Sequence, residues 1–211
     1  MRDSEENVVK AILISIKPKW VAKILNGEKT LEIRKTMPKC ELPIDVYIYC
    51  TKKLSQRFLI KKGEQIGIKE NGEDIIADTN IITKYPTMFE FNFGGKVVAK
   101  FTLNKVEEIE PFEEYNSLFG LAYKLTEKGI INCQKAQLTY EEYNHYLKGK
   151  RGYAWHIDNL VVFDKPKELN EFYVYSHSVA GVGLDGKDKT FEILKPLTKA
   201  PQSYCFIRDV L

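Results

Sequence analysis

The chain has 211 residues, which is long enough to bury a substantial core in one domain or in two small ones. Hydrophobic residues make up 44% of it and charged residues 29%, which are values of globular proteins and exclude a disordered chain. No apolar run approaches the ~18–20 residues that a membrane-spanning helix needs, and the acidic, polar segment 1–7 does not have the pattern of a signal peptide. We therefore expect a cytoplasmic protein.

The four cysteines do not indicate a metal site. They form no C-x-x-C pair and do not cluster with the three histidines, so we expect reduced thiols, no bound metal and no cofactor. The Gly-rich run at 181–186 lacks the G-x-G-x-x-G spacing of a nucleotide-binding turn. The cysteines are Cys40, Cys50, Cys133 and Cys205.

The first predicted elements are a strand and a short helix. Residues 8–16 are rich in aliphatic and β-branched side chains and predict a buried strand. Pro18 suits the first position of a helix, where its missing N–H costs nothing, and Val21 and Ile24 lie on one apolar face of that helix. Gly27 follows at the point where a helix ends in a left-handed turn.

After this glycine the pattern changes to the alternation of a strand. Leu31 and Ile33 point to one side, which we expect to face the core. The opposite surface then carries a hydroxyl, a carboxylate and a guanidinium, with the Lys29 ammonium beside them at the start of the strand. These three polar groups belong to Thr30, Glu32 and Arg34. An ordinary exposed Glu–Arg pair, worth about 0–1 kcal/mol, is the alternative interpretation of the same spacing.

Positive charge is concentrated in this part of the chain. Segment 17–39 holds seven lysine or arginine side chains and two glutamates, a net charge of +5 within a chain whose total is +3. A local basic patch indicates an anionic partner more strongly than a high overall charge does, although such a cluster is also typical of a solvated face.

The later elements are short strands with a few helices between them. We expect strands at 45–51, 96–107, 153–163 and 204–207, helices at 112–127 and 140–147, and a helical turn at 166–172. Thr139 and Glu142 have the spacing of a capping box, which starts the second helix. This order of elements, without βαβ repetition, predicts an α+β fold in a single domain spanning residues 1–211, built as a small mixed barrel flanked by helices. The domain carries a probable insertion at about 52–95 and a Gly-rich loop at about 176–189.

Several segments resemble the signature of ASCH domains, which belong to the PUA-like superfamily of pseudo-β-barrels. The first is Ile16-Lys17-Pro18 followed by Ile24-Leu25-x-Gly27-x-Lys29-Thr30-x-Glu32-x-Arg34. Tyr153-Ala-Trp155-x-Ile157 with Phe163 and Pro166 resembles the late strand, and Pro201-Gln202-Ser203 resembles the ending of some bacterial and phage members. The resemblance implies a mostly antiparallel pseudo-β-barrel flanked by several helices, with a ligand cleft between the first helix and the barrel.

Members of that family are proposed to bind RNA or modified nucleotides, so the resemblance implies an RNA- or nucleotide-binding module with a cationic cleft. Lys17, Lys29 and Arg34 would meet phosphates. A base would stack on Trp155, with Trp20 and Tyr153 as other candidates, although each tryptophan also fits a role in core packing. The remaining polar contacts, including those to a base edge, would come from Thr30, Glu32, Gln202 and Ser203.

The alternative is a hydrolase, because some relatives are described as ribonucleases and others as amidohydrolases that act on a modified nucleoside. Lys29 would then stabilise developing negative charge, Glu32 would act as general acid or base, and Thr30 would be a hydroxyl donor or nucleophile. The amidohydrolase pattern places a threonine three residues after its lysine, where this sequence has Glu32. His156 is a further candidate acid, although a lone strand histidine is more often structural. A protein-binding regulator is a third interpretation, suggested by the unexplained insertion alone.

Overall fold

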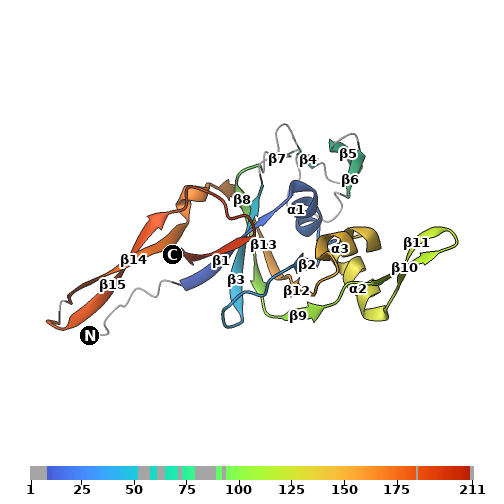
Figure 1. The fold of residues 1–211 in the computed structure, drawn as a ribbon. Helices are drawn as coiled ribbons and strands as arrows, with labels where there is room; N and C mark the ends of the chain where they lie inside the picture. Colours follow the sequence, from blue (N-terminus) through green and yellow to red (C-terminus); the bar gives the residue numbers. More distant parts are fainter. Residues whose placement is uncertain are drawn as a thin grey trace.

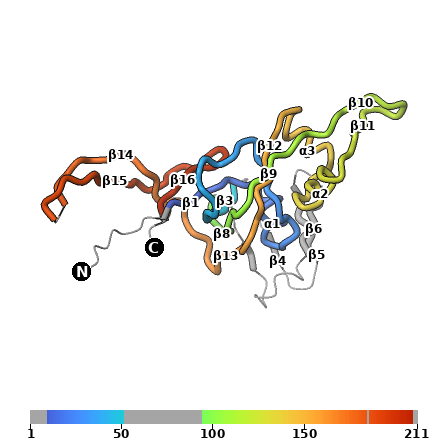
Figure 2. The backbone as a smooth tube through the Cα atoms, turned by 90° about the horizontal axis from the view of Figure 1, so that it is seen from below, coloured from blue at the N-terminus to red at the C-terminus, as the bar shows by residue number. Residues whose placement is uncertain are grey.

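The computed structural model describes residues 9–51, 58–60, 65–70, 73–78, 89–91, 94–183 and 185–209. Within these ranges, two hairpins project from opposite ends of a central body made of strands and three α-helices (Figure 1, Figure 2). Most of segment 52–95, the predicted insertion, lies outside the described residues. The described part of that segment includes four short strands, β4 (Phe58–Ile60), β5 (Gln65–Glu70), β6 (Glu73–Asp78) and β7 (Phe89–Phe91).

The largest sheet contains seven strands. They are β1 (Val9–Ile16), β3 (Ile44–Cys50), β8 (Val97–Leu103), β13 (Asp158–Lys167), β14 (Tyr173–Val182), β15 (Asp188–Pro196) and β16 (Tyr204–Asp209). Their order is β13-β8-β3-β1-β16-β14-β15, and among the described strands only the pair β1–β3 is parallel. The predicted α+β class and mostly antiparallel pairing are confirmed, while the described strands close no complete barrel.

Both faces of the central strands are buried, which explains the continuous aliphatic run of β1. Ile12 and Ile14 point to the face covered by α1 (Pro18–Leu25). Leu13 points to the other face, where it packs in one cluster with Tyr47 and Phe172. A strand buried on two faces needs apolar side chains at consecutive positions, and β1 has them.

Helix α1 forms where the sequence predicts it. Pro18 occupies the first turn, and Val21 and Ile24 are fully buried against the sheet. Gly27 has φ of 74°, the left-handed conformation that ends the helix and that glycine adopts without a steric penalty. The chain therefore turns directly from α1 into β2 (Leu31–Arg34).

A second sheet places β2 inside the molecule. It has the order β2-β12-β9, with β12 (Gly152–His156) and β9 (Val106–Ile109). Leu31 and Ile33 pack on α2 (Glu127–Ala136) and α3 (Tyr140–Leu147), while Trp155 on the other face belongs to the core beneath α1. All four residues of β2 are buried, so the alternative of an ordinary exposed Glu–Arg pair is wrong. Strand alternation cannot show that a second layer covers the polar face.

The segment predicted as a helix at 112–127 is a hairpin instead. It consists of β10 (Glu113–Ser117) and β11 (Gly120–Lys124), joined by a turn where Gly120 has φ of 113°. Leu118 and Phe119 are fully exposed at this turn, so the apolar residues that matched a helical period do not mark a buried helix face. The following capping box is confirmed, because the Thr139 hydroxyl accepts from the Glu142 N–H and the Glu142 carboxylate accepts from the Thr139 N–H.

The predicted Gly-rich loop at 176–189 is also mostly strand. β14 and β15 pair along nearly their whole length, and the chain reverses near Gly186, which has φ of 72°. A Cβ added at Gly181 would lie 3.0 Å from the Phe191 ring. The glycine in β14 therefore allows a close contact with an aromatic ring and does not indicate a loop.

Within the described ranges, no helix is long and apolar enough to cross a membrane, and no group of three or more metal-ligating side chains is arranged to hold an ion. All four cysteines are free. Burial raises the pKa of the Cys50 thiol to about 12, which keeps it protonated at neutral pH.

Asn144 fixes α3 against the chain between β9 and β10. Its Oδ1 accepts from the Phe112 N–H at 2.7 Å, and its Nδ2 donates to the Phe112 carbonyl at 2.7 Å.

Asn144→Ala leaves both of these buried backbone groups without their partner, so we expect the free energy of unfolding to fall by roughly 2–4 kcal/mol in a urea titration. Asn170→Ala, at an exposed position, is the control and should change it by less than about 0.5 kcal/mol. A loss below about 1 kcal/mol for Asn144→Ala contradicts this role.

Candidate functional site

The pairing of β2 with β12 decides which side chains meet. Glu32 lies opposite Trp155, and Arg34 lies opposite Tyr153, so these four side chains share one face of the sheet. Trp155 packs in the core cluster that includes α1, which identifies this face as the one toward α1. Ile33 and Ala154, which alternate with these residues, point to the other face, toward α2.

Three charged side chains form a buried group on this face, the Lys29–Glu32–Arg34 triad. Glu32 Oε1 lies 3.1 Å from Arg34 Nε, and Glu32 Oε2 lies 3.3 Å from Lys29 Nζ. The three side chains are only 2%, 10% and 8% exposed, in chain order. The charges that the sequence placed near one another are therefore in contact and largely withdrawn from water.

The other donors of the triad reach three separate parts of the fold. Lys29 Nζ donates to the Ala136 carbonyl at the end of α2, at 2.8 Å. Arg34 Nη2 donates to the Ser15 carbonyl in β1, at 2.7 Å, and Arg34 Nη1 lies 3.5 Å from the Ser203 hydroxyl just before β16. The triad therefore connects β2 to α2, to the first strand and to the last strand.

Charge within the triad is not balanced. Burial lowers the pKa of Lys29, because the interior disfavours the ammonium, while the Glu32 carboxylate opposes this shift. Arg34 stays charged at any physiological pH. With both cations charged, one carboxylate faces two positive groups, and the remaining positive potential favours an anionic ligand.

Exposed and half-buried side chains surround the place where Arg34 meets Ser203. Lys35 Nζ lies 5.1 Å from the centroid of the Tyr146 ring. The Tyr204 ring contacts the Trp155 ring edge to face, with centroids 5.4 Å apart. Lys17 and Gln202 are exposed beside the ends of β1 and β16. We name this set the Arg34 rim, and it consists of Lys17, Lys35, Tyr146, Gln202, Ser203 and Tyr204.

Tyr146 connects the Arg34 rim to the triad electrostatically. Burial raises the pKa of its hydroxyl, and the charges of Arg34 and Glu32 act on it in opposite directions. Both charges therefore lie close enough to influence this ring, which α3 supplies. The residue is 37% exposed, which leaves part of it accessible to a ligand.

The structure brings only some of the predicted site residues together. Lys29, Glu32, Arg34 and Ser203 converge, as the contacts above describe. Lys17 and Gln202 are exposed beside this group, in the Arg34 rim, and Thr30 is exposed just before β2. Trp155 is fully buried in the core, and His156 points to the opposite face of the sheet. A ligand contact by any of these residues stays a prediction.

Sequence reasoning missed Ser15 and Tyr146. Ser15 acts on Arg34 through its backbone carbonyl, which any residue type supplies, so the sequence holds no signal for it. Tyr146 lies in a helix that the capping box predicted, next to the buried Leu147. Its closeness to Arg34 depends on how α3 packs, which local periodicity does not determine.

Comparison with known proteins gives a family match and a set of similar structures. The chain matches the family model of the ASCH domain over residues 14–167. It is similar to the solved structures of ASCH from Zymomonas mobilis and of two mutants of that protein, each at 16% identity, a TM-score of 0.44 and coverage of 75% of this chain. The shares of those chains are 73% for the first and 74% and 76% for the mutants. No curated protein matches the sequence.

The triad generates a prediction for stability. Glu32→Gln keeps the shape of the side chain but leaves Lys29 and Arg34 without their carboxylate. Because an uncompensated buried charge is costly, we expect the free energy of unfolding at neutral pH to fall by about 3–5 kcal/mol, measured by urea titration. The matched control is Glu41→Gln, at an exposed position, which should change it by less than about 0.5 kcal/mol.

The same variant has a predicted pH dependence. In the wild type Glu32 raises the pKa of Lys29, so in Glu32→Gln the pKa of Lys29 in the folded state falls further below its unfolded value. A base with a lowered folded-state pKa binds fewer protons when folded, and stability then rises with pH. The deficit of Glu32→Gln against the wild type should therefore shrink between about pH 7 and pH 10. A deficit that stays constant over this interval contradicts the conclusion that Glu32 raises the pKa of Lys29.

Proposed function

Because the chain belongs to the ASCH domain family, we propose that it binds RNA or a nucleotide in a cationic cleft between α1 and the strands β2 and β12, entered at the Arg34 rim. The observation that carries the proposal is the composition of this region. Two cations face one carboxylate in the triad, and the Arg34 rim combines lysines with aromatic rings. Single-stranded nucleic acids need this combination, since their phosphates require positive charge and their bases stack on aromatic side chains.

Phosphate contacts are assigned to the cations of the rim. Lys17 and Lys35 are exposed, so they can approach a phosphate without a structural change. Arg34 already donates to the Ser15 carbonyl and lies within reach of the Ser203 hydroxyl, so its guanidinium is held in one orientation. These contacts and the Glu32 ion pair use three of the five N–H groups of Arg34. The remaining two, on Nη1 and Nη2, would donate to a phosphate at the rim.

Base contacts are assigned to the tyrosines and polar groups of the rim. Tyr146 presents an exposed ring from α3, and Trp155 supports the Tyr204 ring from below. Gln202, which is exposed, and Ser203 would hydrogen-bond a base edge. In this proposal Lys29 and Glu32 organise the site from within, while Arg34 and the exposed groups of the rim touch the ligand.

Hydrolysis is the second candidate, and the lowered pKa of Lys29 is the observation that favours it, because catalytic lysines share this property. Lys29 Nζ, however, already contacts the Ala136 carbonyl and Glu32 and is 2% exposed, so a substrate would have to displace these partners. Wild-type protein incubated with RNA and with acylated nucleosides tests this directly by mass spectrometry. Product that disappears in Lys29→Met supports hydrolysis, and absence of product from both substrates rejects it.

The phosphate contacts generate a salt-dependence prediction. Lys17→Ala and Lys35→Ala each remove one cation, so the slope of log Kd against log salt for short single-stranded RNA should become shallower by about 0.7 per variant. Fluorescence anisotropy between about 50 and 200 mM salt measures this slope. Lys165→Ala removes an exposed lysine on β13 as the matched control and should leave the slope unchanged. Equal slopes in all four proteins would overturn the assignment of phosphates to the Arg34 rim.

The base contact generates a separate prediction. Tyr146→Ala should weaken binding of the same RNA by about 1–3 kcal/mol, which is the typical stacking contribution of one base. Tyr146→Phe keeps the ring and should bind nearly as well as the wild type. Tyr175→Ala removes an exposed ring from the distant β14–β15 hairpin and serves as the control. If Tyr146→Ala and Tyr175→Ala bind equally well, Tyr146 does not stack on a base.

A further inference from the structure

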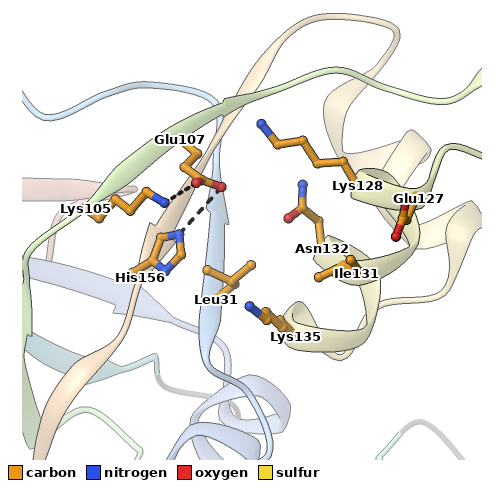
Figure 3. Close-up of a pocket in the computed structure, with 9 residues that line it drawn as sticks. All are labelled: Leu31, Lys105, Glu107, Glu127, Lys128, Ile131, Asn132, Lys135 and His156. Atoms are coloured by element: carbon orange, nitrogen blue, oxygen red, sulfur yellow. Dashed lines mark ion pairs between the residues drawn. The ribbon is translucent and has the colours of Figure 1, made fainter.

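A cavity of about 360 Å³ lies on the other face of the β2–β12 pair, away from the triad. Its walls come from β2, β9, β12, the chain just before β9, and α2. Figure 3 shows side chains of α2 reaching across an open space toward Glu107 and His156 on the sheet. The α2 cavity, as we name it, is lined by Leu31, Lys105, Glu107, Glu127, Lys128, Ile131, Asn132, Lys135 and His156.

Lysine side chains give the α2 cavity a small excess of positive charge. Lys105 is ion-paired with Glu107 and lowers the pKa of that carboxyl, so this pair is internally compensated. Lys128 and Lys135 form no ion pair with the residues that the structure describes. Both project from α2 at the margin of the cavity (Figure 3). The lining of three lysines and two glutamates therefore carries a net charge of +1, and the charge of Lys128 also helps to lower the pKa of the Glu107 carboxyl.

Polar and apolar groups complete the lining. His156 Nε2 is buried, lies 3.7 Å from Glu107 Oε2 and has no hydrogen-bond partner within the described ranges. A buried ring nitrogen without a hydrogen bond is uncommon, and a water, an ion or a ligand group in the cavity would satisfy it. Asn132 is 4% exposed and points toward the same space, and Leu31 and Ile131 provide an apolar wall.

We propose that the α2 cavity binds a nucleoside monophosphate, with its phosphate between Lys128, Lys135 and His156 and its base against the apolar wall. The volume lies in the range of small-molecule sites. Most of the lining side chains are charged or polar, which suits an ionic ligand better than an apolar one. Lysine binds phosphate as a point charge and needs no fixed geometry, which suits two exposed ammonium groups. The proposal does not depend on RNA binding at the Arg34 rim, since no residue belongs to both sites.

Isothermal titration calorimetry with adenosine 5′-monophosphate, inorganic phosphate and adenosine tests this site. We expect the monophosphate to bind, phosphate to bind more weakly, and adenosine to bind weakly or not at all. The double variant Lys128→Ala/Lys135→Ala should lose at least about tenfold in affinity for the monophosphate, because two charge-assisted contacts are removed. Lys165→Ala is the control and should bind as the wild type does. Since both lysines are exposed, the thermal unfolding of the double variant should match that of the wild type.

The outcomes separate this site from the Arg34 rim. A monophosphate affinity that falls in Lys17→Ala/Lys35→Ala and stays unchanged in Lys128→Ala/Lys135→Ala would place the nucleotide at the Arg34 rim and overturn the proposal. No monophosphate binding by the wild type, or equal affinity in the Lys128→Ala/Lys135→Ala variant, would overturn the proposal. Displacement of the monophosphate by short single-stranded RNA would assign the phosphate contact to a nucleic-acid strand and overturn the choice of a free nucleotide.

Discussion

Glu32 is buried between Lys29 and Arg34, and the arrangement of the surrounding elements depends on this interaction. A carboxylate withdrawn from water is stable only when charged partners and hydrogen bonds replace its hydration. The two cations that perform this role also contact the Ala136 carbonyl of α2 and the Ser15 carbonyl of β1. The electrostatic requirement of one carboxylate therefore determines how β2, the first strand and the second helix meet.

Stability alone does not explain such a group, because well-packed apolar side chains of similar volume often stabilise a core equally well or better. The triad retains one more cation than it needs to compensate Glu32, and the excess lies beside a rim of lysines and tyrosines. This imbalance connects the packing of the strand to the proposed ligand, since a nucleic-acid phosphate is the anion that would compensate it. In the same strand pair, the opposite face borders the α2 cavity.

Local chemistry made part of the fold predictable. Pro18 begins α1 and Gly27 ends it, and the capping box of Thr139 and Glu142 begins α3. These residues were recognisable because each of them acts on neighbouring backbone groups. The hairpin at Leu118 and the long strands around Gly181 were not predictable in this way. The helical spacing of apolar residues at 112–127 was coincidental, because Leu118 is fully exposed. Gly181 allows the Phe191 ring to pack closely against β14.

The candidate site was predictable to the same limited extent. Spacing placed Lys29, Glu32 and Arg34 together, but their burial depends on α2 and α3, which are distant in the sequence.

A crystal structure of the protein with short single-stranded RNA tests the central claim most directly. The account predicts a phosphate within hydrogen-bond distance of the Arg34 guanidinium and a base on the Tyr146 or Tyr204 ring. RNA bound at another surface, with the Arg34 rim empty, would contradict it.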